Sequence, residues 1–306
     1  MISKFRILEN NEIDKVKWDE VVSNSEFSNY SGLSYFLDAI YPNWKGVIYE
    51  DYKYVFPLTI GSKFNIDFLI TPIFIPYVGV SSYKKDYSNI IPSLLEAINK
   101  QTKYIDLYID PYTSRFLDGE TNSIRKGQVL NLDKSHLEIQ SDYSKNHKRN
   151  IKKGNNNKLN IKTSIDVKRF ISLFKSNKGE QLKELKELNY FTLIQALEKS
   201  IENKTGFLLD CYDRNNLICS AFFIVFNNRV TYIKGFSSSE GRAKGAMHFL
   251  IDHVISIYSK SEIIFDFGGS NSLPVAQFNY GFGAKDIFYQ NYKINNLPYL
   301  LKLFKP

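Results

Sequence analysis

Apolar and polar residues change their spacing along the chain, most regularly in its second half. Three runs rich in branched and aromatic residues, 206–212, 217–226 and 230–236, are separated by Asp- and Asn-rich turns. This pattern predicts antiparallel strands. Apolar residues then recur at helical spacing from Met247 to Tyr258, which predicts an amphipathic helix. Beyond it, the pattern predicts a strand over 263–267, a short helix over 275–280 and a strand over 287–293.

The first half repeats this order more faintly. Strands are predicted over 46–50, 54–60 and 64–70, a helix over 89–100 and a strand over 104–109. Matching elements lie about 160 residues apart, which indicates a duplicated unit. In each half, a helix that crosses to a further strand predicts a right-handed connection and a parallel pair. The predicted fold class is therefore α/β with a mixed, α+β-type sheet, in two units packed side by side over residues 1–135 and 136–306.

Composition excludes several classes of protein. The chain has 306 residues, of which 43% are hydrophobic, enough for a sizeable core without disulfide or metal support. Its longest apolar run, 68–80, is too short for a bilayer span and contains two prolines. The first 15 residues lack an apolar signal core. We therefore expect a cytoplasmic protein with no membrane span, with Cys211 and Cys219 as reduced thiols and no metal site.

The positive charge is concentrated in one segment. The formal net charge is +8, yet residues 143–165 contain seven basic residues and no acidic one. Five of them share one face of a helix, which predicts either a solvated basic helix or a cradle for a phosphorylated ligand; they are Lys145, Lys148, Arg149, Lys152 and Lys153. Only eight of the 40 basic residues are arginine, which argues against a sequence-specific DNA reader.

Two long motifs resemble a known family. The runs YIKGFSSSEGRAKGAMHFLIDHVI and IIFDFGGSNSLPVAQFNYGFGAK are similar to the second half of tandem GNAT-fold acyltransferases, in particular the FemAB-like subgroup. The segment SKNHKRNIKKG resembles the basic helix that precedes the second unit in those proteins, and Trp44 with YKYVFPLTI resembles their first unit. The resemblance implies transfer of an acyl group to an amine, with acyl-CoA or aminoacyl-tRNA as the donor.

The segment before the helix at Met247 is the predicted donor site. Gly241 and Gly245 allow the backbone to approach an anion, the helix amides point at it, and Arg242 and Lys244 add charge. An ordinary capped loop is the alternative interpretation. The full set of predicted donor-binding residues is Lys234, Gly235, Phe236, Gly241, Arg242, Lys244, Gly245 and Ala246.

Two positions depart from the family pattern. Met247 stands where the family's coenzyme loop has a small residue, and a bulky side chain there crowds a pyrophosphate. The aminoacyl-tRNA donor therefore stays open beside acyl-CoA. Gln277 stands where many GNAT enzymes have an acidic tyrosine four residues before a Gly-Phe pair. The sequence therefore assigns no general acid.

The remaining candidates serve catalysis and the acceptor. Asp266 is the predicted base or ammonium ligand, with a structural turn cap as the alternative, and Ser270 lies beside it. The acceptor, a small or nucleotide-linked amine, is predicted to contact Lys145, Arg149, Lys152, Asn271 and Gln277. We expect a degenerate first unit that shapes the acceptor site, since residues 71–82 contain two prolines and only Gly79 as glycine.

Three functions follow as hypotheses. The first is an N-acyltransferase that uses acyl-CoA and direct amine attack. The second is a FemAB-like aminoacyltransferase that uses aminoacyl-tRNA on a cell-wall precursor. The third is a non-catalytic binding module of the same shape.

Overall fold

The chain folds into two compact units. The computed structural model describes all residues except 1–4, 64–65, 118–120, 179–184, 269–271 and 300–306. One unit comprises Met1–Arg125 together with Phe288–Pro306, and the other comprises Lys126–Ile287. We call them unit 1 and unit 2.

Unit 1 contains two groups of strands. The first is an antiparallel sheet in the order β1 (Phe5–Leu8), β2 (Lys45–Tyr49), β3 (Tyr54–Leu58) and β6 (Ser81–Ser82). The second has the order β4 (Ile60–Lys63), β5 (Ile66–Ile70), β7 (Tyr104–Ile109) and β14 (Lys285–Asn295), in which only the β5–β7 pair is parallel. The α-helices of this unit are α1 (Lys15–Asn24), α2 (Ser34–Ile40) and α3 (Ile91–Asn99).

Unit 2 is built on one mixed sheet. Its strand order is β8 (Thr121–Asn131), β13 (Ile264–Asp266), β12 (Arg229–Ser237), β11 (Asn216–Phe226), β10 (Gly206–Asp213) and β9 (Asn160–Ser164). Only the β12–β13 pair is parallel. The helices are α4 (His136–Ser141), α5 (Lys145–Asn156), α6 (Val167–Lys178), α7 (Glu187–Glu202), α8 (Ser239–Ala243), α9 (Ala246–Tyr258) and α10 (Leu273–Tyr280).

The same three-strand pattern occurs in both units, and each copy is completed by a strand from the other half of the chain. In unit 1, β5 and β7 are parallel and joined through α3, and residues 290–295 of β14 pair with β7. In unit 2, β12 and β13 are parallel and joined through α9, and residues 129–131 of β8 pair with β13. The predicted repeat and its parallel pairs are confirmed. The two units differ from the predicted ranges 1–135 and 136–306, because unit 2 begins at Lys126 and most of β14, from Phe288 onward, belongs to unit 1.

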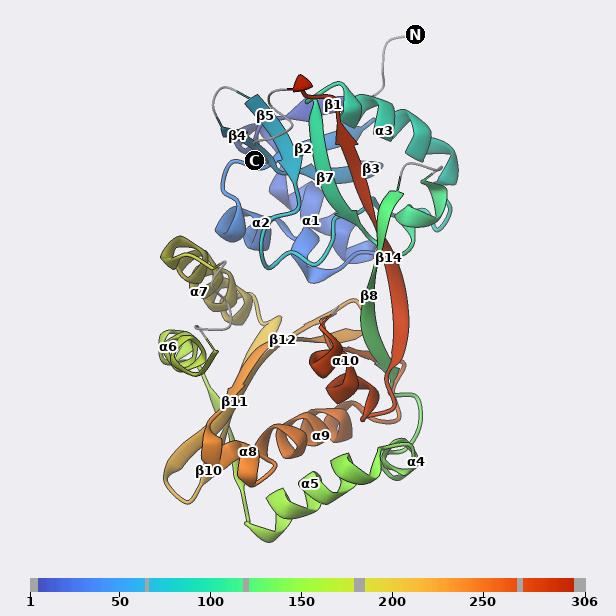
Figure 1. The fold of residues 1–306 in the computed structure, drawn as a ribbon. Coiled ribbons are helices and arrows are strands. Elements are labelled where there is room, and N and C mark those ends of the chain that lie inside the picture. Colours follow the sequence, from blue (N-terminus) through green and yellow to red (C-terminus); the bar gives the residue numbers. More distant parts are fainter. Residues whose placement is uncertain (1–4, 64–65, 118–120, 179–184, 269–271, 300–306) are drawn as a thin grey trace. The chain divides into compact units, whose positions relative to one another are not determined.

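Helices cover both faces of the unit 2 sheet (Figure 1). Helices α5, α8 and α9 lie on one face, and α6 and α7 lie on the other. The core on the α9 side joins Ala221 and Phe223 of β11 with Leu250 and Val254 of α9, all fully buried. Burial of the large apolar side chains in this layer contributes about 1.5–3 kcal/mol each, so the layer stabilises the packing of α9 on the sheet.

Three glycines allow α5 to approach α9 and α10 closely. A methyl group on Gly154 would lie 2.7 Å from Phe249 Cβ. A methyl group on Gly245 would overlap the carbonyl oxygen of Asn150, and one on Gly281 would overlap the ring of His147. His147 also donates from Nε2 to the carbonyl of Phe278 over 2.8 Å and accepts from the Ser144 hydroxyl at Nδ1. These contacts fix the buried side of α5, so its basic side faces solvent.

One predicted strand differs in detail, since the strand expected over 54–60 divides into β3 and β4. The elements with no predicted counterpart include α1, α2, α4, α6 and α7 and the strands β1, β6, β8 and β9. Within the described ranges, no helix has the length and apolar character needed to cross a membrane.

The buried histidines make unit 2 sensitive to acid. Burial lowers the pKa of His248 to about 4 and also lowers that of His147. In the unfolded chain a histidine titrates near its ordinary pKa of about 6.5, so the unfolded state binds more protons between pH 6.5 and 4. We therefore predict that lowering the pH through this window removes up to about 3 kcal/mol of unfolding free energy through His248.

The check is urea unfolding at pH 7.5, 5.5 and 4.5 for the wild-type protein and His248→Phe. The variant keeps the ring contact with Phe278, whose centroid lies 5.0 Å from that of His248, but takes up no proton. Its stability must fall less steeply with pH than that of the wild type. Parallel pH profiles for the two proteins would contradict the assignment.

Candidate donor site in unit 2

The segment predicted as an open anion-binding loop is the short helix α8. Ser238 caps it, and its hydroxyl accepts the Gly241 amide over 3.0 Å. The amides of Arg242, Lys244 and Gly245 donate to backbone carbonyls at 2.9–3.3 Å. Four amides of the expected phosphate cradle are therefore already used, and the prediction of an open loop is wrong. The signal was present in the sequence, since a serine followed by an acidic residue in the first turn is typical of a helix start.

The glycines of this region contact protein rather than open space. A methyl group on Gly241 would overlap the carbonyl of Ile218, and one on Gly235 would lie 2.8 Å from Met247 Cε. Gly245 has φ +72° and faces the backbone of α5. These positions need glycine because of helix packing and backbone conformation. Ala246, the first residue of α9, is fully buried.

The basic side chains of α8 and its C-cap are bound internally. The Lys244 ammonium contacts Asp213 and lies 2.7 Å from Glu240, and hydrogen bonding to Asp213 raises its pKa. The Arg242 guanidinium donates to the carbonyl of Ser237 over 2.6 Å. A phosphate at Lys244 would have to compete with both carboxylates, whereas the exposed Arg242 uses one of its five N–H donors in this contact.

Beyond its short pairing with β13, β12 offers backbone donors. The parallel pairing ends at Thr231 opposite Asp266, whereas β12 continues to Ser237. The Ser238 amide donates to Ile218 O, and Phe236 lies opposite Ser220. Because hydrogen-bonded and non-bonded pairs alternate in an antiparallel ladder, the amides of Gly235 and Ser237 point away from β11. These amides are the candidate oxyanion donors of the site.

Two other predicted donor contacts lie on β12. Phe236 is buried, with its ring centroid 6.2 Å from that of Phe170 on α6, so it is part of the core. Lys234 is half-buried and lies opposite Phe222 in the ladder. Their roles as donor ligands stay predictions.

Asp266 has the structural environment given as its alternative. Arg229 Nη1 donates to Oδ2 over 2.7 Å, and the Gly268 amide donates to Oδ1 over 2.8 Å. The side chain is buried, so the carboxylate holds the end of β13 and is not placed as a free base. Ser270 and Asn271, predicted beside it, lie outside the described residues.

A tyrosine that sequence reasoning left unassigned is the centre of a polar network. Tyr280, at the end of α10, donates to Asp286 over 2.7 Å and accepts from Lys126 Nζ over 3.0 Å. Gln128 donates to the same carboxylate over 3.0 Å. Tyr280 and Asp286 are six residues apart, but Lys126 and Gln128 on β8 lie more than 150 residues before them, so no local motif could reveal the whole network. Gln277 on the same helix is exposed.

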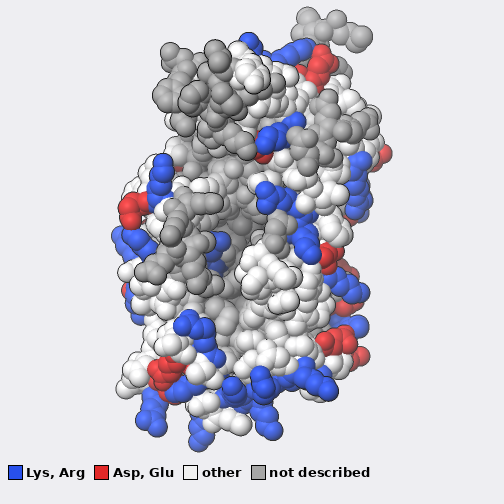
Figure 2. Space-filling view, in the orientation of Figure 1, with Lys and Arg blue, Asp and Glu red and all other residues white. Residues whose placement is uncertain are grey.

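The basic side of α5 presents five exposed positive charges. Lys145, Lys148, Arg149, Lys152 and Lys153 are all exposed, and His147, Ile151 and Gly154 form the buried side. Figure 2 shows lysine and arginine side chains gathered over this helix at the bottom of the view. Among the described residues, none of these five forms an ion pair with a carboxylate. Lys153 Nζ lies 3.5 Å from the carbonyl of Ala243, which places this surface beside α8.

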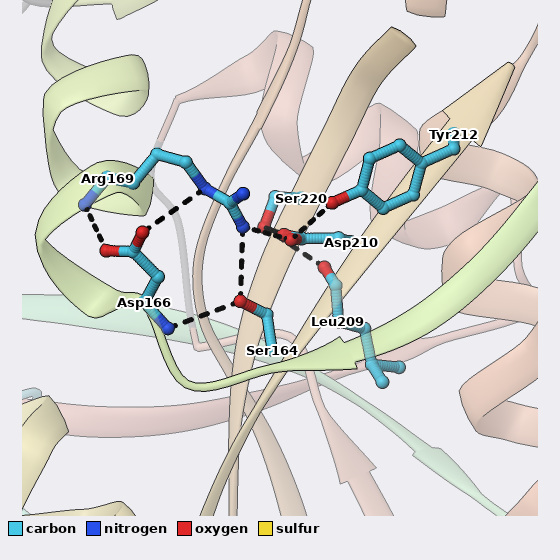
Figure 3. Close-up of polar contacts among 7 residues, drawn as sticks. All are labelled: Ser164, Asp166, Arg169, Leu209, Asp210, Tyr212 and Ser220. Atoms are coloured by element: carbon cyan, nitrogen blue, oxygen red, sulfur yellow. Dashed lines mark hydrogen bonds and ion pairs between the residues drawn. The ribbon is translucent and has the colours of Figure 1, made fainter. Parts of the chain in front are cut away.

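An ion pair between a buried aspartate and a partly exposed arginine holds α6 on the opposite face of the sheet (Figure 3). Asp210 of β10, only 2% exposed, contacts Arg169 and accepts from the Ser220 hydroxyl over 2.7 Å and from Tyr212 over 3.2 Å. Arg169 also donates to Ser164 over 3.1 Å. The carboxylate is fully engaged, so this cluster is structural. Within the described part of the chain, no group of three or more His, Cys, Asp or Glu residues could hold a metal ion.

Comparison with solved structures identifies the fold. The FemX crystal structure is similar with a TM-score of 0.69 and 13% identity, over 98% of this chain and 99% of that one. The chain has a tandem GNAT-like fold of the FemX type. The structure of L-PGS from Bacillus licheniformis gives a TM-score of 0.59 and 10% identity over 95% and 94% of the two chains. A tandem GNAT protein from the clavulanic acid pathway gives 0.51 and 10% over 96% and 99%.

No protein-family model and no curated protein sequence matches the chain. The likeness therefore lies in the fold, and it confirms the predicted recognition and fold class.

Gly245 tests the packing of the α8–α9 junction. We predict that Gly245→Ala lowers the unfolding free energy by about 2–4 kcal/mol, because the methyl group adds left-handed strain and overlaps the Asn150 carbonyl. Gly283→Ala is the matched control, since Gly283 has φ +82° and the nearest atom to its methyl group would lie 3.4 Å away. In the control, the unfolding free energy should fall by only about 1 kcal/mol, the cost of placing alanine in a left-handed conformation. Urea unfolding compares the two, and equal losses would show that Gly245 is not closely packed.

Proposed function

We propose that the protein is an aminoacyltransferase that takes its aminoacyl group from a tRNA ester and transfers it to an amine. The observation that carries the proposal is the exposed, unpaired basic side of α5 beside α8. A polyanion neutralises such a surface and releases counterions, which drives binding. The closed α8 segment supports the same choice, since it leaves no glycine-rich cradle for a pyrophosphate.

The composition of the surface favours a nucleic-acid backbone. It is lysine-rich, and lysine acts as a point charge on phosphate without reading base edges. The residues predicted to bind an anionic acceptor, Lys145, Arg149 and Lys152, are reassigned in this proposal to the donor.

The chemistry requires little from the protein beyond position and charge. The neutral amine attacks the ester carbonyl, an N–C bond forms, the ester C–O bond breaks, and the ribose hydroxyl leaves with a proton. The amides of Gly235 and Ser237 supply hydrogen bonds to the oxyanion, each of a kind worth about 2.7–4 kcal/mol in other acyl transfers.

Transfer from acyl-CoA is the second candidate. It is supported by the start of α9, where the Phe249 amide makes the first helical bond, to the Gly245 carbonyl over 3.0 Å. The amides of the turn before it have no partner within the helix, which is the usual setting for an anion at a helix N-terminus. The bulk of Met247 in this turn and the internal pairing of Lys244 weigh against it.

Charge reversal on α5 tests the tRNA surface. We predict that Lys145→Glu with Lys152→Glu lowers the affinity for unfractionated tRNA at least tenfold at 100 mM salt, and makes the slope of log K against log salt shallower by about two. The control is Lys84→Glu with Lys168→Glu, which changes the charge equally at exposed lysines elsewhere. Fluorescence anisotropy at 50–300 mM salt measures both. Equal losses in the two double variants would contradict a defined site.

Product analysis tests the reaction. We expect the protein to convert [14C]aminoacyl-tRNA and a lysine-containing peptide to the aminoacylated peptide, and acetyl-CoA to give no product. Mass spectrometry of the peptide separates the hypotheses. Acetylated peptide would support the second candidate, and tRNA binding without any product would indicate a binding module.

A further inference from the structure

Unit 1 contains a cavity that the proposed function has not used. It has a volume of about 20 Å³, is partly open to solvent, and lies between α1, the segment 27–32 and the chain around residue 79. Such a volume holds one or two water-sized groups. The cavity therefore takes a small head group and not a whole substrate. Its lining includes Trp18, Phe27, Asn29, Tyr77, Gly79 and Asp110.

Asp110 carries the chemistry of this cavity. It follows β7 and is 3% exposed. Its Oδ1 accepts the amides of Tyr112 and Thr113 at 2.8 and 3.0 Å, but the buried Oδ2 has no hydrogen-bond partner. An unsatisfied buried carboxylate oxygen is costly, and a bound donor would remove this cost. Burial raises the pKa of Asp110 to about 6, so the carboxylate is mainly ionised at neutral pH.

Gly79 makes room for that oxygen. A methyl group on Gly79 would overlap Oδ2, and both residues line the cavity. Only glycine allows the carboxylate to take this position. The single glycine of the segment 71–82, taken in the sequence as a sign of degeneration, has a steric role at the cavity wall.

The lining selects positive charge. It contains one carboxylate, three aromatic residues (Trp18, Phe27 and Tyr77) and no lysine, arginine or histidine, although the chain has a net charge of +8. A buried carboxylate pairs with an ammonium, and aromatic faces attract cations. We propose that this cavity binds the ammonium head group of a primary amine, which donates to Asp110 Oδ2. This inference rests on the proposed function in one respect, since it assigns the cavity to the amine acceptor.

The test uses the full chain without any donor. Methylammonium chloride is titrated at pH 8 into protein labelled with 13C at the aspartate carboxyl carbons, and NMR follows the Asp110 signal. We expect a saturable shift of that signal, and none with potassium chloride or sodium acetate at equal ionic strength. Asp110→Asn, whose Oδ1 can keep the Tyr112 and Thr113 contacts, should bind methylammonium at least tenfold more weakly by calorimetry.

A second variant at the cavity wall and a control outside it complete the test. Gly79→Ala displaces the carboxylate and should also weaken binding at least tenfold. Asp67→Asn removes a carboxylate from an exposed position of unit 1 outside this lining and should bind like the wild type. Thermal unfolding of each variant confirms that it is folded.

The outcomes separate this inference from the proposed function. An Asp110 signal that moves equally with potassium and methylammonium, or undiminished binding by Asp110→Asn, overturns the inference even if aminoacyl transfer is observed. Saturable binding that Asp110→Asn abolishes, together with no transfer from tRNA or acetyl-CoA, supports the ammonium site and rejects the proposed function.

Discussion

Unit 2 depends on the close approach of α5 to α9 and α10. Three glycines, Gly154, Gly245 and Gly281, bring backbone and ring atoms into contact where any side chain would overlap. Because the helix is held on this side by His147 and Ile151, its lysines are presented on the other side without a compensating acid. At Gly245 the same contact fixes the junction between α8 and α9. Packing thus determines which side of α5 is charged, while the Ser238 cap and the backbone bonds of α8 close the preceding segment.

Much of the fold could be predicted because it depends on local periodicity. The strands β10, β11 and β12, the helix α9 and the short α10 follow directly from apolar spacing and turn residues. The repeated unit of a strand, a helix and a parallel strand could also be predicted from the sequence, since both copies follow the same order. The exchange of β8 and β14 was not, because strand pairing between distant segments leaves no local trace.

The site was less predictable than the fold, because one sequence pattern is compatible with two different local structures. A run with Gly241, Arg242, Lys244 and Gly245 is compatible with an anion cradle and with a capped helix. The choice depended on partners elsewhere, namely Asp213 on β10, Ser237 on β12 and Asn150 on α5. Asp110 was missed for a similar reason. Nothing beside it in sequence shows that Gly79 adjoins it or that one of its oxygens is left without a partner.

The pairing of β14 with β7 has a consequence for biosynthesis. The strand that completes the second group of unit 1 lies at residues 290–295, about 180 residues after the strand it accompanies. Unit 2, which ends at Ile287, has all its strands translated before that segment emerges from the ribosome. Unit 1 is therefore the last to acquire its full complement of strands, and the nascent chain carries an exposed β7 edge until residues 290–295 have been synthesised.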